Sequence, residues 1–261
     1  MNEFVGYILN VLGGNSLNWK IQHNVLHHSF TNIEGHDEDI TPLPVLRFNP
    51  HAKLRKIHRL QHIYAWFFYG LMTVSWIIGS KEFSQLVRFN KEGLLKGQDA
   101  KFPKEMTKLV ISKLLYLFFM VILPIMVMSI AWYHIILGFL VMHFVAGLIL
   151  ACIFQPAHVM EQCEFPEPSN QESQVIEDWG AHQLKTTSNF GMGSRVFSWL
   201  VGGLNHQIEH HLFPNISHVH YPKIAKIVRE TALEFNLPYN AQPTFLHALY
   251  YHGKMLHALG R

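Results

Sequence analysis

Apolar and polar residues occupy separate blocks along this chain rather than alternating over short intervals. Three apolar blocks cover residues 63–79, 114–131 and 135–154. A helix needs roughly 20 apolar residues to cross a membrane, with a lower limit of about 17. The second and third blocks therefore predict transmembrane helices, whereas the first is at that limit and rich in Trp, Phe and Tyr. Between the two longer blocks, Trp132-Tyr133-His134 predicts a tight turn with aromatic anchors at the membrane interface.

The basic residues predict which side of the membrane the polar segments face. They crowd the stretch before the second apolar block, at Lys81, Arg88, Lys91, Lys96, Lys101, Lys104, Lys108 and Lys113. Cytoplasmic loops carry such an excess of Lys and Arg. If the second and third blocks form a hairpin, the polar segments 15–40 and 158–261 both lie in the cytoplasm. A crossing by residues 63–79 would separate them, so that block is interpreted as an interfacial helix.

The pattern thus predicts an all-α membrane protein that forms a single domain over residues 1–261. A transmembrane helical hairpin and interfacial helices would support a cytoplasmic helical cap. A composition of 49% hydrophobic and 15% charged residues is too apolar for a disordered chain and too lightly charged for an average soluble protein. The net charge of +3 comes without a basic, aromatic-rich stripe, so no nucleic acid partner is expected. Cys152 and Cys163 form no C-x-x-C motif, which argues against a disulfide framework or a zinc knuckle.

The chain contains 19 histidines, and part of them form two clusters. The first cluster has the sequence Gln22-His23-Asn24-Val25-Leu26-His27-His28. On an α-helix, His23 and His27 share a face one turn apart. His28 lies about 100° further round and can reach a second metal ion.

The second cluster has the sequence His206-Gln207-Ile208-Glu209-His210-His211. Gln207, His210 and His211 have the i, i+3, i+4 spacing of one helix face. Neutral imidazole is a good ligand for Zn, Cu, Fe and Ni, so the residue type alone does not select the metal. Two facing helices that each offer such ligands could hold a pair of metal ions.

Three other readings of these clusters fit less well. Surface histidines without a function would not be expected to repeat an H-H pair with a partner one turn earlier. A zinc protease would need H-E-x-x-H, and Glu209 instead directly precedes His210. A soluble carboxylate di-iron bundle would need E-x-x-H pairs, which these clusters lack.

Single histidines outside the clusters are interpreted one by one. His158 ends the last apolar block and is a candidate ligand, because polar groups at helix ends often build sites. His143 lies inside that block and is expected to be neutral and hydrogen-bonded to a neighbouring helix. The remaining histidines have no matching spacing and are assigned structural or solvated roles, His182 least firmly: His36, His51, His58, His62, His182, His218, His220, His247, His252 and His257. The acidic run Asp37-Glu38-Asp39 is interpreted as a solvated turn.

The two clusters resemble motifs of the membrane fatty acid desaturases. Residues 22–31 (QHNVLHHSFT) resemble that family's second histidine box, and residues 202–214 (GGLNHQIEHHLFP) resemble its third. A third box that begins with Gln207 instead of His is similar to the front-end and acyl-CoA desaturase branch. His158 falls where the family places an extra ligand after its last span.

The resemblance implies an O2-dependent dehydrogenation that leaves a cis double bond in an acyl chain carried by CoA or by a lipid. It implies two irons (a non-haem di-iron centre) and an external electron donor, such as ferredoxin or cytochrome b5 with its reductase. The protein would position the chain and exclude side reactions. The implied iron ligands are the histidines of both boxes, His158, and Gln207 as a ligand or as a group that orients one: His23, His27, His28, His158, Gln207, His210 and His211.

One feature departs from the family pattern. The first box, an H-x(3,4)-H, would precede Gln22, and no histidine precedes His23. The chain is therefore expected to be truncated, with two spans and two ligands missing, and not to be a competent desaturase as it stands. Six histidines and Gln207 fall short of the eight or more donors that two irons would want.

Two rival functions stay open at this stage. A hydroxylase or ketolase on the same di-iron scaffold would carry its metal ligands in the same kind of histidine boxes. A non-catalytic, truncated membrane protein that binds metal weakly or not at all would also explain the absent box. The double-bond position, the acyl carrier, the electron donor and the oligomeric state are not readable from the sequence.

Overall fold

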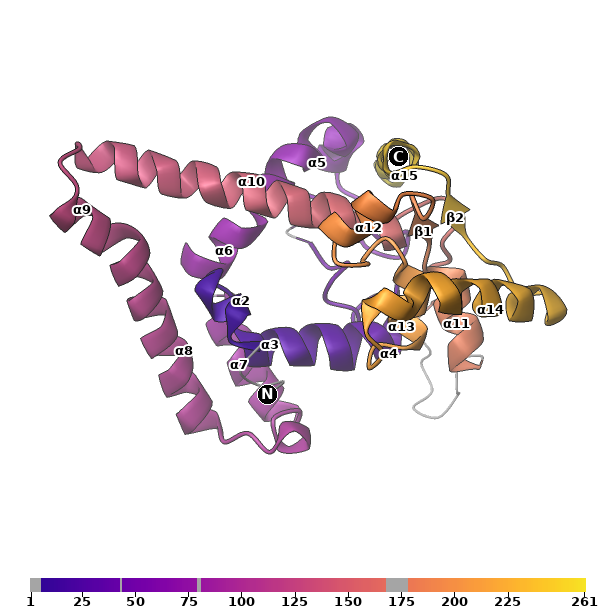
Figure 1. Ribbon diagram of the computed structural model, residues 1–261, viewed down its shortest axis with the longest axis horizontal. Coiled ribbons are helices and arrows are strands. Elements are labelled where there is room, and N and C mark those ends of the chain that lie inside the picture. The colour runs from indigo at the N-terminus through magenta and orange to yellow at the C-terminus, as the bar shows by residue number, and fades with distance from the viewer. Residues whose placement is uncertain (1–5, 43, 79–80, 168–177) are drawn as a thin grey trace. The chain divides into compact units, whose positions relative to one another are not determined.

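The computed structural model describes residues 6–42, 44–78, 81–167 and 178–261, and most of these residues lie in helices (Figure 1). The α-helices are α2 (Ile8–Val11), α3 (Ser16–Trp19), α4 (His28–Phe30), α5 (Gln61–Gly70), α6 (Met72–Ile78), α7 (Lys81–Lys91), α8 (Phe102–Leu117), α9 (Leu123–Val127), α10 (Trp132–His158), α11 (Trp179–Thr186), α12 (Arg195–Leu200), α13 (Gln207–Leu212), α14 (Tyr221–Glu234) and α15 (Phe245–Leu259). Two π-helices, η1 (Lys20–His27) and η4 (Phe118–Ile122), and three short 3-10 helices complete them: η2 (Lys56–Leu60), η3 (Lys96–Gln98) and η5 (His218–His220). Strands β1 (Asn189–Phe190) and β2 (Ala241–Gln242) pair in parallel, with Asn189 opposite Ala241 and Phe190 opposite Gln242.

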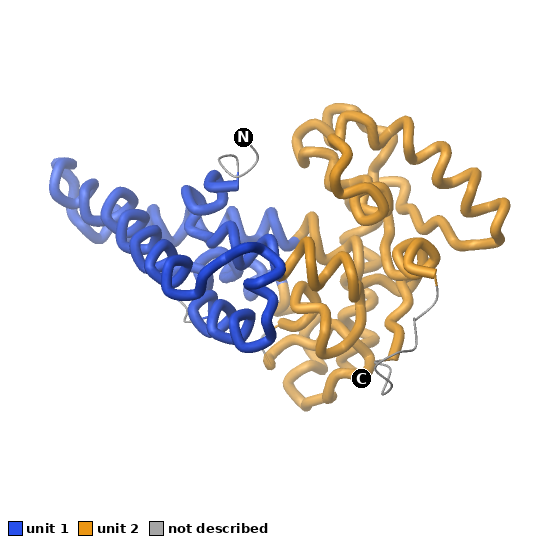
Figure 2. The backbone as a smooth tube through the Cα atoms, turned by 90° about the horizontal axis from the view of Figure 1, so that it is seen from below, with its two compact units in different colours: residues 1–21, 66–151 blue, residues 22–65, 152–261 orange. Residues whose placement is uncertain are grey.

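The chain divides into two compact units (Figure 2). Residues 1–21 and 66–151 form one, termed here the apolar unit, and residues 22–65 and 152–261 form the other, termed the histidine unit. Both histidine clusters and His158 belong to the histidine unit. The interpretation of residues 1–261 as one functional domain stays a prediction.

Two helical stretches are long and apolar enough to cross a membrane. The first runs from Phe102 to Val127 through α8, η4 and α9, and the second is α10. Each predicted span therefore overlaps a candidate span, and the candidate spans are longer than the apolar blocks alone indicated. The predicted turn at Trp132 was wrong, because Trp132 is the first residue of α10. The chain turns earlier, where Met128 leaves the helix with an extended backbone (φ −93°, ψ 135°).

The first apolar block forms two helices rather than one. Helix α5 ends at Gly70 and α6 begins at Met72, and Gly79 lies outside the described residues. The break occurs where backbones meet closely, since a Cβ on Gly147 would lie 2.8 Å from the carbonyl oxygen of Gly70. Neither helix alone has the length of a span. The interfacial position of this block stays a prediction.

His143 makes the contacts expected of a hydrogen-bonded histidine between helices. Its Nε2 lies 2.7 Å from the hydroxyl of Tyr116 on α8, and its Nδ1 lies 3.1 Å from Oγ1 of Thr73 on α6. The side chain is buried, beside a core formed by Ile77, Tyr116 and Phe139. The prediction of hydrogen bonding to a neighbouring helix is confirmed.

A buried ion pair joins three parts of the apolar unit. The ammonium group of Lys113 on α8 contacts a carboxylate oxygen of Glu82 on α7 and donates a hydrogen bond to the carbonyl oxygen of Gly13 at 2.5 Å. The other Glu82 oxygen accepts a hydrogen bond from the backbone N–H of Asn15 at 2.8 Å. Burial raises the pKa of Glu82, and the neighbouring Lys113 opposes that rise. The pair thus holds a charged lysine inside a candidate span.

The histidine unit has two apolar cores that place its helices. One joins Ile153 and Ala157, near the end of α10, to Phe190 of β1 and Ala248 of α15. The other joins Ile208 of α13 to neighbours from α11 and α14, namely Leu184, Val228 and Ala232. These cores hold the end of α10 and the helix of the second histidine cluster within the same unit.

Removal of one partner from the buried ion pair should be more damaging than removal of both. Lys113→Met leaves the Glu82 carboxylate buried without its cation, which is expected to cost about 3–5 kcal/mol of stability. The double variant Lys113→Met/Glu82→Gln removes both charges and should be clearly more stable than the single variant. Thermal unfolding of all forms in the same detergent measures the difference. Equal losses in the single and double variants would contradict the pairing.

Candidate metal centre

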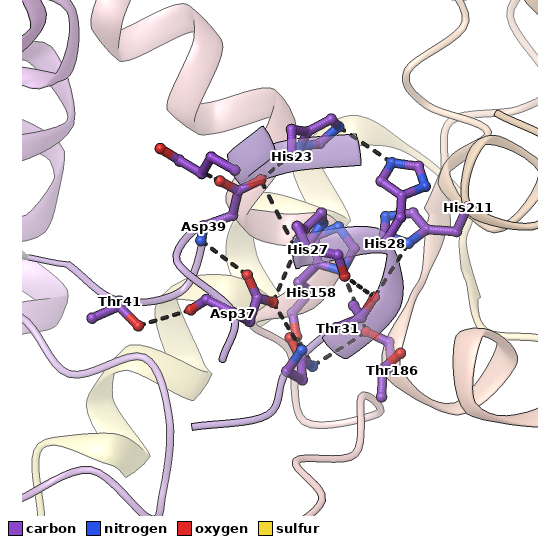
Figure 3. A network of polar contacts seen from close by, with 12 residues as sticks. His23, His27, His28, Thr31, Asp37, Asp39, Thr41, His158, Thr186 and His211 are labelled. Atoms are coloured by element: carbon purple, nitrogen blue, oxygen red, sulfur yellow. Dashed lines mark hydrogen bonds and ion pairs between the residues drawn. The ribbon is translucent and has the colours of Figure 1, made fainter. Parts of the chain in front are cut away.

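Six histidines meet in the interior of the histidine unit (Figure 3). They come from three separate parts of the chain: His23 and His27 from η1 with His28 from the start of the adjoining α4, His158 from the end of α10, and His210 and His211 from α13. All are buried except His210, which is partly exposed. The sequence predicted all six as ligands, and the structure brings them together.

The first group consists of His23, His28 and His210, whose ring nitrogens lie within 4.8 Å of one another. The Nε2 atom of His23 lies 3.3 Å from that of His210 and 3.4 Å from that of His28. Local backbone explains why His23 joins His28, five residues later. Segment η1 is a π-helix, and its i to i+5 hydrogen bonding brings residues five apart onto one side. The sequence analysis assumed an α-helix, and on that assumption it expected His28 to reach a different metal ion from His23.

The second group consists of His27, His158 and His211, also within 4.8 Å. Their ring centroids are 4.6 to 4.8 Å apart in each pair. The two groups touch, because the rings of His28 and His211 stack at 4.3 Å with an angle of 6° between them. The site is therefore one continuous cluster with two places where three imidazole nitrogens converge.

Two carboxylates hold the outer nitrogens of the first cluster. Asp39 Oδ2 lies 2.6 Å from Nδ1 of His23, and Asp37 Oδ2 lies 2.9 Å from Nδ1 of His27 (Figure 3). A carboxylate that accepts the Nδ1 proton fixes the tautomer and leaves the Nε2 lone pair free for a metal. These contacts also explain why His23, His27 and Asp39 form a third potential ligand group.

The interpretation of Asp37-Glu38-Asp39 as a solvated turn was wrong, since Asp37 is 0% exposed. The chain reverses at Asn32, which has a left-handed backbone (φ 63°), and the acidic run folds back onto η1. The backbone N–H of Asn32 then donates to Asp37 Oδ2 at 2.9 Å. A turn that brings a later segment back onto the same helix leaves no periodic signal in the sequence.

Neutral partners orient the rings of the second group. Nδ1 of His211 lies 2.8 Å from Oε1 of Gln183, and the Gln183 amide donates to the carbonyl oxygen of His28 at 3.1 Å. Nδ1 of His158 lies 3.4 Å from the carbonyl oxygen of Thr186. His182, next to Gln183, is not part of the cluster, and its Nε2 lies 2.9 Å from the carbonyl oxygen of Thr31. Gln183 was missed in the sequence analysis, because a lone Gln on a short helix has no distinctive pattern.

A second anchor holds α13 from the side away from the cluster. The buried carboxylate of Glu209 accepts hydrogen bonds from Nδ2 of Asn189 at 2.8 Å and from the hydroxyl of Tyr239 at 2.9 Å. Oδ1 of Asn189 accepts from the backbone N–H of Ile208 at 2.9 Å. Strand β1 and the segment before β2 thereby set where His210 and His211 point.

The pKa values of three rings in the cluster favour neutral imidazole, which is the form that a metal ligand needs. Burial and neighbouring imidazoles lower the pKa of His28 to about 2, burial and the charges of His23 and His27 lower the pKa of His210 to about 3, and burial also lowers the pKa of His211. Burial would lower the pKa of His27 too, but the carboxylates of Asp37 and Asp39 raise it above its ordinary value. Neutral imidazole is the form that binds a metal, and at His27 a metal ion would take the place of a proton.

Unsatisfied polar atoms support the fit of a metal ion to this cluster. Within the described part of the chain, Nε2 of His211 and both amide atoms of Gln207 are buried without a hydrogen-bond partner. Each such atom costs about 1–3 kcal/mol if nothing satisfies it. A cation at the second group would satisfy His211, so the residues fit a metal centre. Whether Gln207 is a ligand or orients one stays a prediction.

Comparison with known proteins places this chain among lipid-modifying enzymes. The sequence profile of the fatty acid desaturase family matches residues 1–243. The sn-1 linoleoyl-lipid 6-desaturase of Synechocystis sp. is 33% identical over 265 residues, which cover 100% of this chain and 72% of that protein. The Delta(5) fatty acid desaturase A of Dictyostelium discoideum is 36% identical (96% of this chain, 54% of the relative), and the acyl-lipid (8-3)-desaturase of Physcomitrium patens is 37% identical (98% and 53%). This chain spans about half the length of these last two relatives. No solved structure matches.

The carboxylate contacts predict the effect of a conservative change next to the cluster. Asp39→Asn keeps the size of the side chain but removes the charge that orients His23. The expected result is about a 10- to 100-fold loss of metal affinity with little change in the amount of folded protein. Metal titration of the purified protein measures it, with Asp99→Asn, an exposed aspartate of the apolar unit, as the matched control. Unchanged affinity in Asp39→Asn would show that the carboxylate does not support the site.

Proposed function

The chain belongs to the fatty acid desaturase family, and on that premise we propose that it introduces a cis double bond into a fatty acyl chain by O2-dependent removal of two hydrogens. The observation that carries the proposal is the pair of converging three-histidine groups in one buried cluster. The family match rests on sequence similarity over residues 1–243, and the cluster adds that the histidines of both boxes converge in space.

The proposed cofactor is a pair of irons, one at each three-histidine group. Imidazole also suits zinc, copper and nickel, so the choice of iron rests on the family. When bound, the irons would supply the activation of O2 that the removal of hydrogen from an unactivated methylene requires. Gln207 has a buried amide without a hydrogen-bond partner among the described residues, on the helix that carries His210 and His211, and it is proposed as an additional ligand or as a group that orients one.

The chain's own residues have three tasks in this proposal. The six imidazoles supply neutral nitrogen donors from four elements of one unit. Asp37, Asp39 and Gln183 accept the outer ring protons and so fix which nitrogen faces inward. Burial of the cluster excludes bulk water from the neighbourhood of the reacting carbon, which limits side reactions.

The proposed substrate is an acyl chain carried by a membrane lipid. This choice follows the names of the relatives, which are linoleoyl-lipid and acyl-lipid desaturases. An acyl-CoA substrate is the competing possibility, and assays with each carrier separate the two. The proposed electron donor is a small carrier such as cytochrome b5 or ferredoxin, and both polar segments are proposed to face the cytoplasm.

In a chain extended upstream by a segment that carries the H-x(3,4)-H box, replacement of one histidine in either group should abolish both metal binding and activity. His210→Ala and His27→Ala each remove a donor that no neighbouring group can replace, so a loss of about 100-fold or more is expected rather than a graded effect. Iron per chain is measured first, followed by the mass of the acyl product, which also separates loss of two hydrogens from gain of oxygen. His247→Ala, an exposed histidine on α15, is the control and should retain full iron. Normal iron and full product in either cluster variant would refute the ligand assignment.

The topology has its own test. Cysteines introduced at the exposed positions Ser84 and Ser217 should both be labelled from the cytoplasmic side by a membrane-impermeant reagent. The expectation rests on the basic residues between Lys81 and Lys113 and on two crossings between the labelled sites. Labelling from opposite sides would show an odd number of crossings between the two positions and refute the proposed arrangement.

A further inference from the structure

Helix α12 packs one side against the end of a candidate span. Its Phe197 contacts Phe190 of β1 and Phe245 of α15, with ring centroids 6.1 and 5.2 Å apart. This aromatic group belongs to the same core as Ile153 and Ala157 of α10. Helix α12 therefore lies beside the last turns of α10 (Figure 1).

The other side of α12 exposes large apolar side chains. Val196 is 70%, Trp199 is 78% and Leu200 is 68% exposed. These residues have the i, i+3, i+4 spacing of a single helix face. The exposed residue Arg195 begins the same helix. A contiguous apolar face with a basic residue at its edge is a feature that marks interaction surfaces rather than ordinary water-exposed helices.

The length of α10 indicates at what depth in a membrane the exposed apolar face of α12 would lie. The helix has 27 residues, which at 1.5 Å per residue gives about 40 Å, whereas the hydrocarbon core of a bilayer is about 30 Å thick. Its first residues, Trp132 and Tyr133, are the aromatic types that anchor helices at the membrane interface. With that end at one interface, the turns that contain Ile153 and Ala157 reach the opposite interface. Helix α12 packs against those turns, so it lies at headgroup depth.

We propose that α12 is a membrane-docking helix, with Val196, Trp199 and Leu200 inserted at the boundary between headgroups and acyl chains. The bilayer is the occupant because the helix shares a core with the end of a candidate span, and a span that crosses the membrane would bring α12 to the lipid headgroups. Arg195 at the edge of the face would meet lipid phosphates, as basic residues do on interfacial helices. The proposal concerns placement in the membrane and does not depend on the reaction.

A tight turn connects α12 to α13, the helix that carries His210 and His211. The backbone N–H of Gly203 donates to the carbonyl oxygen of Ser198 at 2.7 Å, and Nδ2 of Asn205 donates to the Ser198 hydroxyl at 2.9 Å. Gly202 and Gly203 have left-handed backbones (φ 60° and 75°), and a Cβ on Gly203 would lie 2.6 Å from Cβ of His218. This tight turn leads directly into α13. Insertion of α12 therefore fixes the depth of His210 and His211 at the membrane surface.

Depth-dependent quenching tests the proposal. In a Cys152→Ala/Cys163→Ala background of the whole chain, a single cysteine at Val196, Trp199 or Leu200 is labelled with an environment-sensitive fluorophore. The protein is then placed, one chain per disc, in phosphatidylcholine–phosphatidylglycerol nanodiscs that contain lipids with a nitroxide near the headgroup or deep in the acyl chain. Lys226, on the exposed side of α14, is the matched control position.

All three α12 positions should show blue-shifted emission and quenching by the shallow nitroxide that exceeds quenching by the deep one by about threefold or more. The label at Lys226 should show water-like emission without quenching. Water-like emission at the three α12 positions would overturn the proposal. So would a blue shift without nitroxide quenching, which would mean that protein covers the face. Helix content and unfolding temperature of each labelled protein confirm that the reporters describe the folded chain.

Discussion

Six imidazole rings packed together, five of them buried, cannot all have both ring nitrogens hydrogen-bonded to other groups of the protein. The histidine unit is organised around this lack of hydrogen-bond partners. Its outer nitrogens are met by Asp39, Asp37 and Gln183, which come from a reversed turn and from α11. Its inner nitrogens face one another at distances as short as 3.3 Å. An interior of this kind is stable only with a cation in it, or with protons that burial disfavours. The packing that brings the rings together therefore also creates the two places that a metal ion could fill.

The sequence was sufficient to predict the set of histidines and the two candidate spans, because both leave strong local patterns. Hydropathy identifies the spans, and paired histidines identify the clusters. The sequence could not predict how the histidines divide, because His23 joins His28 only in a π-helix. The roles of Asp37, Gln183 and Asn189 were also missed, since each depends on chain segments that meet only after folding. The turn placed at Trp132 failed for a related reason: aromatic residues mark the depth of a membrane interface, but they do not stop a helix.

The apolar unit shows how a charge can be misread when residues are only counted. Lys113 was included among the basic residues that predict sidedness, yet it is 6% exposed and paired with Glu82. Its role is to join α8 to α7 and to the segment around Gly13. The seven others of that group, from Lys81 to Lys108, are exposed, and the prediction of sidedness rests on them. The position of Lys113 is thus explained by packing, so its charge does not support the prediction of sidedness.

The stacked rings of His28 and His211 belong to different three-histidine groups, and they are parallel to within 6°. Because the two rings lie face to face, neither can turn without displacing the other. The orientation of one three-histidine group is therefore tied to that of the other, and a substitution that loosens one group should loosen both.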